Sequence, residues 1–204
     1  VKDPFRRNEG CYLVLCECLN IDKEPNSFNT RSHANEIFNL NKNLKPMFGI
    51  EQEFFISCYT EQDDNFLSLE PVCFNNKKLK IKEQGDYYCG IGFDNALGRN
   101  MIEEAFRNIL YSEINVTGLN AEVAPSQWEF QVCSIGIDAA DSLILMRYIC
   151  NRTFEKYNCI MDLSVKPRHD LNGSGCHVNF STKEMREDNG YDKISLAINN
   201  LSNN

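Results

Sequence analysis

The sequence has no run of about 20 apolar residues, so a membrane-spanning helix is not expected. Its start, VKDPFRR, has no apolar segment behind the charged residues, and a signal peptide requires such a segment. Basic residues are also scarce, with 21 Lys and Arg against 29 Asp and Glu and a net charge of −8. This balance excludes a general surface for nucleic acid or anionic membranes. We therefore expect a cytoplasmic protein that has neither nucleic acid nor membrane among its partners.

Several common sequence signatures are missing as well. The chain has only three histidines, and its ten cysteines include no C-x-x-C pair, so a structural zinc site has little support. Without a secretory signal, a disulfide framework is not expected and the cysteines are predicted to be free thiols. The glycine-rich stretch GIGFDNALG has the spacing of neither the dinucleotide fingerprint nor the phosphate loop. We give that stretch no nucleotide-binding role.

What is present indicates a globular core, since 42% of the 204 residues are hydrophobic. The apolar runs 11–19 and 48–57 are rich in strand-forming residues, and both predict strands. Between them, residues 29–43 place apolar side chains close to helical spacing, with Asn29 or Thr30 as the N-cap. The first part of the chain is therefore predicted to run strand, helix, strand.

The remainder of the chain continues this mixture of helices and strands. Residues 61–86 are polar and irregular and predict a surface excursion, whereas the apolar residues between Gly98 and Asn115 recur at helical spacing and predict an amphipathic helix. The further predicted elements are strands at 116–123 and 127–133, a helix at 139–157, a strand at 175–182 and a helix from Asp192 onward. Paired strands with long intervening helices indicate an α+β fold, with the helices on one face of a mainly antiparallel sheet.

Two glutamates in the apolar segment FGIEQEFF project to the same side of a strand. Glu51 and Glu53 are two residues apart, so strand alternation places both carboxylates on one face. Like charges held side by side repel, and a hard divalent ion such as Mg²⁺ or Mn²⁺ would neutralise them. A strand with one solvated face is the alternative explanation, and this pair alone favours it.

Two more carboxylates follow the same pattern. In QWEFQV, alternation directs Trp128 into the core and Glu129 away from it. Glu122 alternates in the same way with apolar neighbours in LNAEV, and Pro125 supplies a break between the two strands. We therefore predict that Glu53, Glu122 and Glu129 converge on one divalent-ion site.

The strand GCHVNFS also divides into two faces. Its apolar residues are predicted to be buried, and these are Cys176, Val178 and Phe180. Its polar residues share the opposite face, and these are His177, Asn179 and Ser181. A lone histidine is more often a structural residue than a ligand, yet this face carries amide and hydroxyl groups suited to a nucleotide or a carboxylate substrate. The preceding NGSG segment offers exposed backbone groups, although such a segment is most often only a turn.

Longer motifs containing these residues resemble glutamine synthetase of the eukaryotic type. The matching segments, in order, are LVLCEC, NTR, FGIEQEFF, GDYYCGIGFDNALGRN, GLNAEVAPSQWEFQV and NGSGCHVNFSTKEMREDNG. They extend over nearly the whole chain, so the resemblance implies that residues 1–204 form part of one glutamine synthetase catalytic domain. The implied fold is α+β, with a mainly antiparallel, partly barrel-like sheet wrapped by helices.

The resemblance also implies roles for single residues. Glu51 and His177 would help to hold one Mg²⁺ or Mn²⁺ ion, and Glu53, Glu122 and Glu129 would hold another. The residues implied to contact the glutamate substrate are Asn172, Gly173 and His177. Those implied to lie along ATP are Asn179, Ser181 and Arg186. Glu53, Glu129 and Arg186 would be the catalytic residues.

The activity implied by the resemblance is an ATP-dependent ligation. The γ-carboxylate of glutamate is phosphorylated and ammonia then displaces the phosphate, which gives glutamine, ADP and phosphate. Two ions and Arg186 would neutralise the transferring phosphoryl group. The family also assembles into homo-oligomers of stacked rings, so a second copy of the chain is an expected partner beside glutamate, ATP and ammonia.

The chain departs from the family pattern in three ways. Met47 stands where the family has an aromatic residue that packs on adenine, and the glycine-proline that follows EFQ in the family is absent. Neither the N-terminal β-grasp domain of the family nor its C-terminal portion has a counterpart in residues 1–204, so we expect the chain by itself to be inactive. A non-catalytic homologue with a structural or interaction role, and a ligase that joins glutamate to another amine, are the alternative functions.

Overall fold

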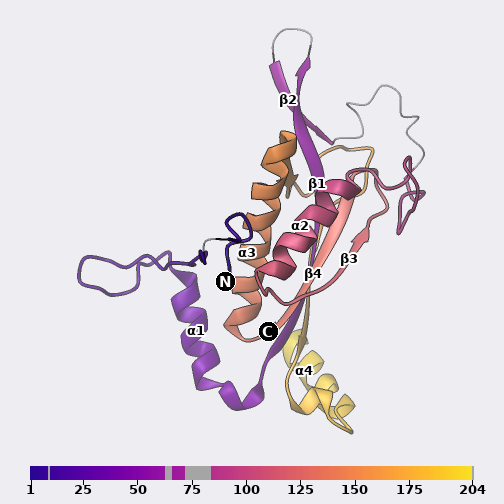
Figure 1. Cartoon of the computed structure of the whole chain (residues 1–204). Coiled ribbons are helices and arrows are strands. Elements are labelled where there is room, and N and C mark those ends of the chain that lie inside the picture. Colours follow the sequence, from indigo (N-terminus) through magenta and orange to yellow (C-terminus); the bar gives the residue numbers. More distant parts are fainter. Residues whose placement is uncertain (9, 63–65, 72–83, 204) are drawn as a thin grey trace.

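The computed structural model describes residues 1–8, 10–62, 66–71 and 84–203, with the backbone alone described for 59–62 and 66–71 (Figure 1). The helices within these ranges are α1 Thr30–Leu40, α2 Arg99–Tyr111, α3 Ile137–Phe154 and α4 Tyr191–Ser202. The strands are β1 Met47–Gln62, β2 Phe66–Pro71, β3 Val116–Ala121, β4 Gln127–Ile135, β5 Cys159–Asp162 and β6 Cys176–Ser181. Short 3₁₀ turns occupy Lys42–Leu44, Glu155–Tyr157 and Glu184–Arg186.

Strand β1 is the centre of the sheet. Its first half pairs with β4 and β6, and its second half pairs with β2 and β5. Strand β3 extends the sheet beyond β4, and every one of these pairings is antiparallel. Across the described residues the sheet stays open, with no closure into a barrel. The predicted α+β fold with an antiparallel sheet is confirmed.

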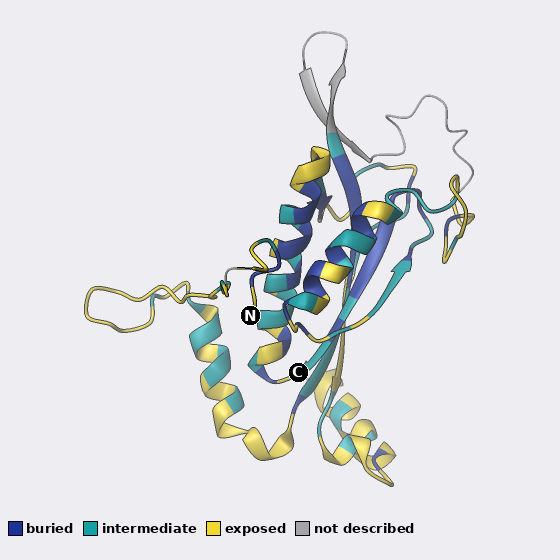
Figure 2. Cartoon of the chain, in the orientation of Figure 1, coloured by how far each residue is buried: buried dark blue, intermediate teal, exposed yellow. Residues whose placement is uncertain are grey.

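The core lies between one face of this sheet and the helices α2 and α3. Phe54 of β1 and Phe130 of β4 stack with their ring centroids 5.9 Å apart, and Phe154 of α3 lies 6.1 Å from Phe54. Figure 2 shows the buried sides of α2 and α3 turned toward the sheet and their exposed sides turned away from it. The helices therefore cover one face of the sheet, as the sequence predicts.

The local sequence explains where the helices form. The side chain of Asn29 accepts a hydrogen bond from the backbone N–H of Ser32, which makes Asn29 the N-cap of α1. Helix α2 buries the apolar positions that recur at helical spacing, namely Met101, Ile102, Ala105 and Ile109. Both helices lie inside the ranges predicted for them, and so do most residues of α3 and α4.

The predicted strand at residues 11–19 is wrong. This segment makes only isolated bridges, Lys2 with Tyr12 and Leu19 with Pro25. The side chains of Tyr12 and Val14 are strongly exposed. A β-prone sequence becomes a strand only where another strand completes its ladder of backbone hydrogen bonds, and the described chain brings no strand beside this segment.

Two further differences concern the sheet. The excursion predicted at 61–86 includes strand β2, which forms a hairpin with β1, while 63–65 and 72–83 lie outside the described residues. Strand β5 has no counterpart among the predicted strands, because its four residues follow directly on a helical pattern.

Strand β6 confirms the element predicted at 175–182, but the predicted burial of its apolar side chains is wrong. Cys176 is exposed, Val178 is 58% exposed and Phe180 is 52% exposed. Strand β6 lies on the opposite edge of β1 from β4, whereas α3 packs over β4, β5 and β1. Phe180 is partly covered by the ring of Phe48, with the two centroids 5.3 Å apart.

The structure also bears on membrane-spanning helices and on the state of the cysteines. No helix in the described part combines the length and apolar character needed to cross a bilayer. The nine cysteines in that part are thiols, and no disulfide joins any two of them.

Trp128 is predicted to stabilise the fold. The side chain is 1% exposed, and its Nε1–H donates a hydrogen bond of 2.8 Å to the carbonyl of Leu97. Trp128→Ala should lower the free energy of unfolding by ~3–5 kcal/mol, because it removes a large buried ring and leaves a cavity. Chemical denaturation followed by circular dichroism measures the change. Tyr191→Ala, at a 77% exposed position, is the control and should change little, whereas an unchanged Trp128→Ala variant would contradict a core role.

Candidate metal centre

Strand pairing brings the predicted carboxylates together. Glu53 of β1 and Glu129 of β4 are direct partners in the antiparallel ladder. Glu122 follows the last residue of β3, and its backbone N–H donates to the carbonyl of Gln127, which closes the turn between β3 and β4. The face of the sheet that carries Glu53 and Glu129 is the one opposite the aromatic core, because each alternates with core residues.

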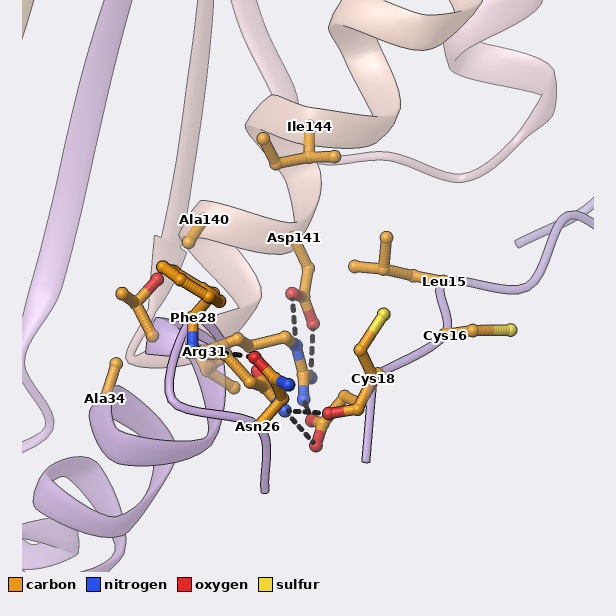
Figure 3. Close-up of a pocket in the computed structure, with 14 residues that line it drawn as sticks. Leu15, Cys16, Cys18, Asn26, Phe28, Arg31, Ala34, Ala140, Asp141 and Ile144 are labelled. Atoms are coloured by element: carbon orange, nitrogen blue, oxygen red, sulfur yellow. Dashed lines mark hydrogen bonds and ion pairs between the residues drawn. The ribbon is translucent and has the colours of Figure 1, made fainter. Parts of the chain in front are cut away.

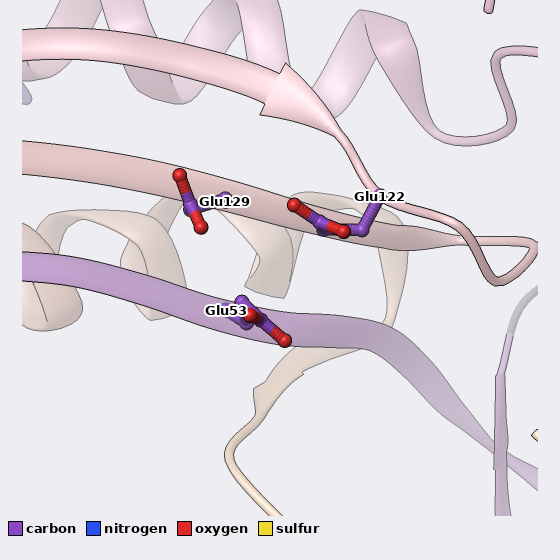
Figure 4. A group of neighbouring side chains, drawn as sticks. All are labelled: Glu53, Glu122 and Glu129. Carbon is purple, nitrogen blue, oxygen red and sulfur yellow. The ribbon is translucent and has the colours of Figure 1, made fainter. Parts of the chain in front are cut away.

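The three side chains form one compact group, shown in Figure 4. Glu53, Glu122 and Glu129 each offer a carboxylate oxygen within 4.8 Å of those of the other two. Glu53 is 9% exposed and Glu129 is 6% exposed. The predicted clustering of the three carboxyl groups is confirmed. The alternative of a solvated strand face, raised for Glu51 and Glu53, does not hold for Glu53.

The surroundings of Glu122 and Glu129 oppose their ionisation. Burial raises the pKa of Glu122, and the nearby charges of Glu53 and Glu129 raise it further. The pKa of Glu129 is also raised, chiefly by burial and then by the charges of Glu51 and Glu53, while a hydrogen bond from Gln131 acts in the opposite direction. Like charges gathered in a poorly hydrated place favour the protonated forms or a bound cation.

Hydrogen bonds fix the position of Glu53. Its Oε2 accepts from Nε2 of Gln127 at 3.1 Å and from the backbone N–H of Gly175 at 3.1 Å. The same Gln127 amide also donates to the carbonyl of Gly173 at 2.9 Å, and the N–H of Glu53 donates to the carbonyl of Gly175 at 3.1 Å. The NGSG loop is thereby held directly beside the carboxylates.

Gln127 is a site residue that sequence reasoning missed. Its position two residues before Glu129 on the same strand face was the available signal. Amides also orient the other two carboxylates, since Nδ2 of Asn120 donates to Glu122 at 2.9 Å and Nε2 of Gln131 donates to Glu129. Each of these two contacts joins residues two apart in the sequence, so it lies along one side of a single strand or its end.

Glu51 and His177 form a second group beside the first. They are direct partners in the ladder between β1 and β6. Nδ1 of His177 lies 3.7 Å from Oε2 of Glu51 and 4.0 Å from Oε1 of Glu53. Nδ2 of Asn179 donates to Oε1 of Glu51 at 2.7 Å. The side chain of His177 is 67% exposed, so this second group is open to solvent where the first is closed.

The remaining predicted site residues lie on β6 and in the segments flanking it. Arg186 donates to both the carbonyl and the hydroxyl of Ser181, at 2.8 and 2.9 Å, and to the carbonyl of Lys45 at 2.8 Å. Asn172 is half-buried in the segment that leads to β6. A side chain at Gly173 would meet the carbonyl of Val165 at 3.0 Å, so the backbone there passes close to another loop.

The first group fits a hard divalent cation. Its donors are carboxylate oxygens, which Mg²⁺ and Mn²⁺ prefer to nitrogen or sulfur. Metal–oxygen distances of about 2.1 Å place opposite ligands about 4.2 Å apart. Oxygens that lie within 4.8 Å of one another therefore need only small side-chain movements to share one ion. The metal-binding roles themselves stay predictions.

A separate pocket lies on the helical side of the chain, between the segment around Cys16 and the first turns of α1 and α3 (Figure 3). Its volume is about 740 Å³. Arg31 occupies one wall and makes a two-pronged contact with Asp141, at 2.8 Å for each bond, together with an ion pair to Glu17. Because both carboxylates neutralise this guanidinium, we interpret Arg31 as a structural link and not as an anion-binding group.

Glu122→Gln tests the electrostatics of the first group. The pKa of Glu122 is higher in the folded chain than its ordinary value of 4.5, so ionising it costs the folded state free energy at neutral pH. Below pH 4.5 the residue is largely protonated in both states and the cost is absent. In metal-free buffer the variant should therefore melt at a higher temperature than the parent at pH 7, and the gain should disappear near pH 4.

The same variant should weaken divalent-ion binding by ~10-fold or more, measured as the rise in melting temperature with added Mn²⁺. Glu184→Gln is the matched control, because Lys193 lowers the pKa of Glu184 and that carboxylate lies outside the group. The control should show neither the gain at pH 7 nor the weaker Mn²⁺ response. If Glu122→Gln behaved as the control does, the three carboxylates would not be electrostatically coupled.

The sequence of this chain matches a known protein family and several of its members. The family description "Glutamine synthetase, catalytic domain" matches residues 29–197. The glutamine synthetase of Candida glabrata is 42% identical over 203 residues, and that of Gallus gallus is 40% identical over 204 residues. Each alignment covers 98% of this chain and 52% of the relative, so the chain spans about half the length of the curated relatives it matches.

A solved structure shows the same fold. The cryo-EM structure of Plasmodium falciparum glutamine synthetase superposes with a TM-score of 0.65, covering 84% of this chain and 36% of that chain. The sequence identity to that protein is 21%, so this likeness concerns the fold alone. The match to the family description extends over most of the chain, and the relatives align with nearly all of it. By sequence and by fold, the chain belongs to the glutamine synthetase family.

Proposed function

We propose that residues 1–204 are part of the catalytic domain of a glutamate–ammonia ligase. The reaction joins ammonia to the γ-carboxylate of glutamate through a γ-glutamyl phosphate, with ATP as the phosphoryl donor. The observation that supports this most strongly is the cluster of carboxylates formed by Glu53, Glu122 and Glu129. Glu53 and Glu129 are both buried, so neither carboxylate is simply solvated. Membership of the glutamine synthetase family supplies the reaction to which such a group belongs.

The glutamates divide between two ions in this proposal. Glu53, Glu122 and Glu129 hold one Mg²⁺ or Mn²⁺, and Glu51 with His177 helps to hold a second. Ions bound there would neutralise the negative charge of the transferring phosphoryl group. The contribution of the chain is to hold the carboxylates still: Gln127 and Gly175 fix Glu53, and the sheet register places Glu129 opposite it. Glu53 and Glu129 are proposed as catalytic residues because they would hold an ion beside the transferring phosphoryl group.

Arg186, Ser181 and Asn179 are proposed to lie along ATP. The hydrogen bonds between Arg186 and Ser181 support a shared role, and Asn179 reaches Glu51 of the second group. A guanidinium carries five N–H donors, more than the contacts to Ser181 and Lys45 use. Arg186 can thus keep its anchor on the protein and still place positive charge beside a phosphate.

The glutamate substrate is proposed to contact Asn172, Gly173 and His177. Support comes from the position of the NGSG loop, which Gln127 and Glu53 tie to the carboxylate groups. The backbone at Gly173 passes close to Val165, which favours glycine there because a larger residue would push the loop away. A γ-carboxylate bound at this loop would lie near both candidate ions.

The wider setting follows the family resemblance. We propose a cytoplasmic protein whose copies assemble into stacked rings and whose small-molecule partners are glutamate, ATP and ammonia. Residues 1–204 would supply part of one catalytic domain in each copy.

A non-catalytic role is the second candidate, and Met47 favours it. Met47 begins β1, opposite Ile135 and Ser181, and is half-buried. The family resemblance implies an aromatic residue at this position that packs on adenine, and a thioether offers no comparable ring face.

The purified chain of 204 residues should bind Mn²⁺ weakly and form no measurable glutamine. Phosphoryl transfer depends on charges placed around the phosphate, and this chain spans about half of its relatives. Each electrostatic contact that is absent commonly costs ~10²–10³ in rate. An ammonia-dependent glutamine assay measures the turnover, with Glu129→Ala prepared in parallel to expose contaminating host enzyme. Robust turnover that Glu129→Ala abolishes would contradict this prediction.

A chimera tests the proposed function itself. Residues 1–204 replace the matching segment of the Candida glabrata relative, which supplies the rest of its own length. The chimera should release phosphate from ATP in the presence of glutamate and form glutamine with ammonia. Glu129→Ala in the chimera should reduce the rate by ~10² or more, because it removes a charge that holds an ion. Glu155→Ala, at an exposed position, is the control and should leave the rate unchanged.

Two outcomes would favour the alternatives. A folded chimera that binds Mn²⁺ but releases no phosphate with ATP and glutamate would support the non-catalytic role. A chimera that turns over with another amine and not with ammonia would support a related ligase.

A further inference from the structure

Two cysteines face each other across the pairing of β1 with β5. Cys58 and Cys159 are direct partners in this antiparallel ladder. Cys58 is half-buried at the edge of the core cluster, and Cys159 is 6% exposed within it. Neither belongs to the proposed ion sites, since both lie on the face of the sheet that α3 covers.

The geometry of such a pair suits a disulfide. Directly opposed residues in an antiparallel ladder have Cα atoms about 4.5–5.5 Å apart. Disulfides span Cα separations of about 4.4–6.8 Å, so the backbone needs no rearrangement to accept the bond. The two sulfur-bearing side chains are also within hydrogen-bonding reach of each other.

The two thiols differ in accessibility, since Cys58 is half-buried and Cys159 is buried. The pKa of Cys159 is raised to about 11, first by burial and then by the neighbouring Cys58. Cys159 is therefore protonated at neutral pH, and its thiol is a weak nucleophile toward a reagent in bulk solvent. Cys58 is the more accessible of the two and is the natural point of first attack on an external disulfide.

We propose that Cys58 and Cys159 form a dithiol–disulfide site that reacts with low-molecular-weight disulfides such as oxidised glutathione. In the first step the thiolate of Cys58 attacks one glutathione sulfur, which forms a mixed disulfide and releases one glutathione thiolate. In the second step the sulfur of Cys159 attacks the Cys58 sulfur and expels the second glutathione, which takes up the proton of Cys159. The protein loses two electrons and two protons, and one oxidised glutathione becomes two reduced molecules.

The bond would tie β5 covalently to the central strand. About 100 residues lie between the two cysteines, so the cross-link closes a long loop and restricts the unfolded chain strongly. The same bond anchors the start of the segment that runs from β5 to Gly175 beside Glu53. Oxidation is thus expected to stabilise the sheet on which the carboxylates sit.

The experiment uses the chain of 204 residues with five other cysteines replaced by serine. These are the exposed Cys16, Cys18, Cys89 and Cys176, together with Cys73. The protein is incubated at neutral pH with oxidised or with reduced glutathione, and remaining thiols are then alkylated. Peptide mapping by mass spectrometry should find Cys58 linked to Cys159 only after incubation with oxidised glutathione. Cys58 carrying a stable glutathione while Cys159 stays a thiol, or no reaction at Cys58, would overturn the proposal.

Thermal unfolding supplies a second readout. The oxidised protein should melt ~5 °C or more above the reduced protein, because the cross-link destabilises the unfolded state. Adding Cys58→Ser to the same background should abolish both the linked peptide and the rise in melting temperature. Cys133→Ser is the matched control at a second half-buried cysteine of the sheet and should leave both effects in place. A linked peptide without any rise in melting temperature would show that the disulfide forms only when the native pairing of β1 with β5 is distorted. That result would also overturn the proposal.

Discussion

Alternation of side chains along β1 is the constraint on which the remaining structure depends. This one strand pairs with β2, β4, β5 and β6, so a shift of its register would displace most of the sheet at once. Phe54 faces the aromatic core and Glu53, its neighbour, faces the carboxylate group on the other side. A one-residue slip would exchange the two faces, placing charges in the core and aromatic rings at the site. The core and the site are therefore specified by the same pattern.

Keeping three carboxylates together costs free energy, and the surroundings compensate only in part. Amide groups of Gln127, Asn120 and Gln131 donate one hydrogen bond each to Glu53, Glu122 and Glu129. Such bonds offset only part of the cost of burial and leave the mutual repulsion in place, so the pKa values of Glu122 and Glu129 remain raised. A site that stays electrostatically unsatisfied is well suited to capture a cation, because binding relieves a cost that folding has imposed.

Sequence patterns were informative where a local rule decides the outcome. The period of two in FGIEQEFF and QWEFQV located the core and the carboxylate face, and the period near 3.6 located α2 and α3. They failed where the outcome depends on distant partners. Residues 11–19 have strand-forming side chains but no strand beside them in the part of the chain that the structure describes, and β6 has apolar side chains that α3 does not cover. The hydrogen bonds of Gln127 could not be predicted, because one requires the register of β1 against β4 and the other requires the NGSG loop to fold back onto β4.

The ion pairs of Arg31 have a consequence for how the molecule opens. Helix α1 buries none of its own residues, so little apolar surface holds it to the body of the chain. At its start Arg31 joins Asp141 of α3 and Glu17 of the preceding segment, and nearer its end the ring of Phe38 lies 5.7 Å from that of Phe48. Salt screens such partly exposed pairs, and apolar burial is not screened in this way. Added salt is thus expected to loosen the start of α1 more than it loosens the sheet and its carboxylates.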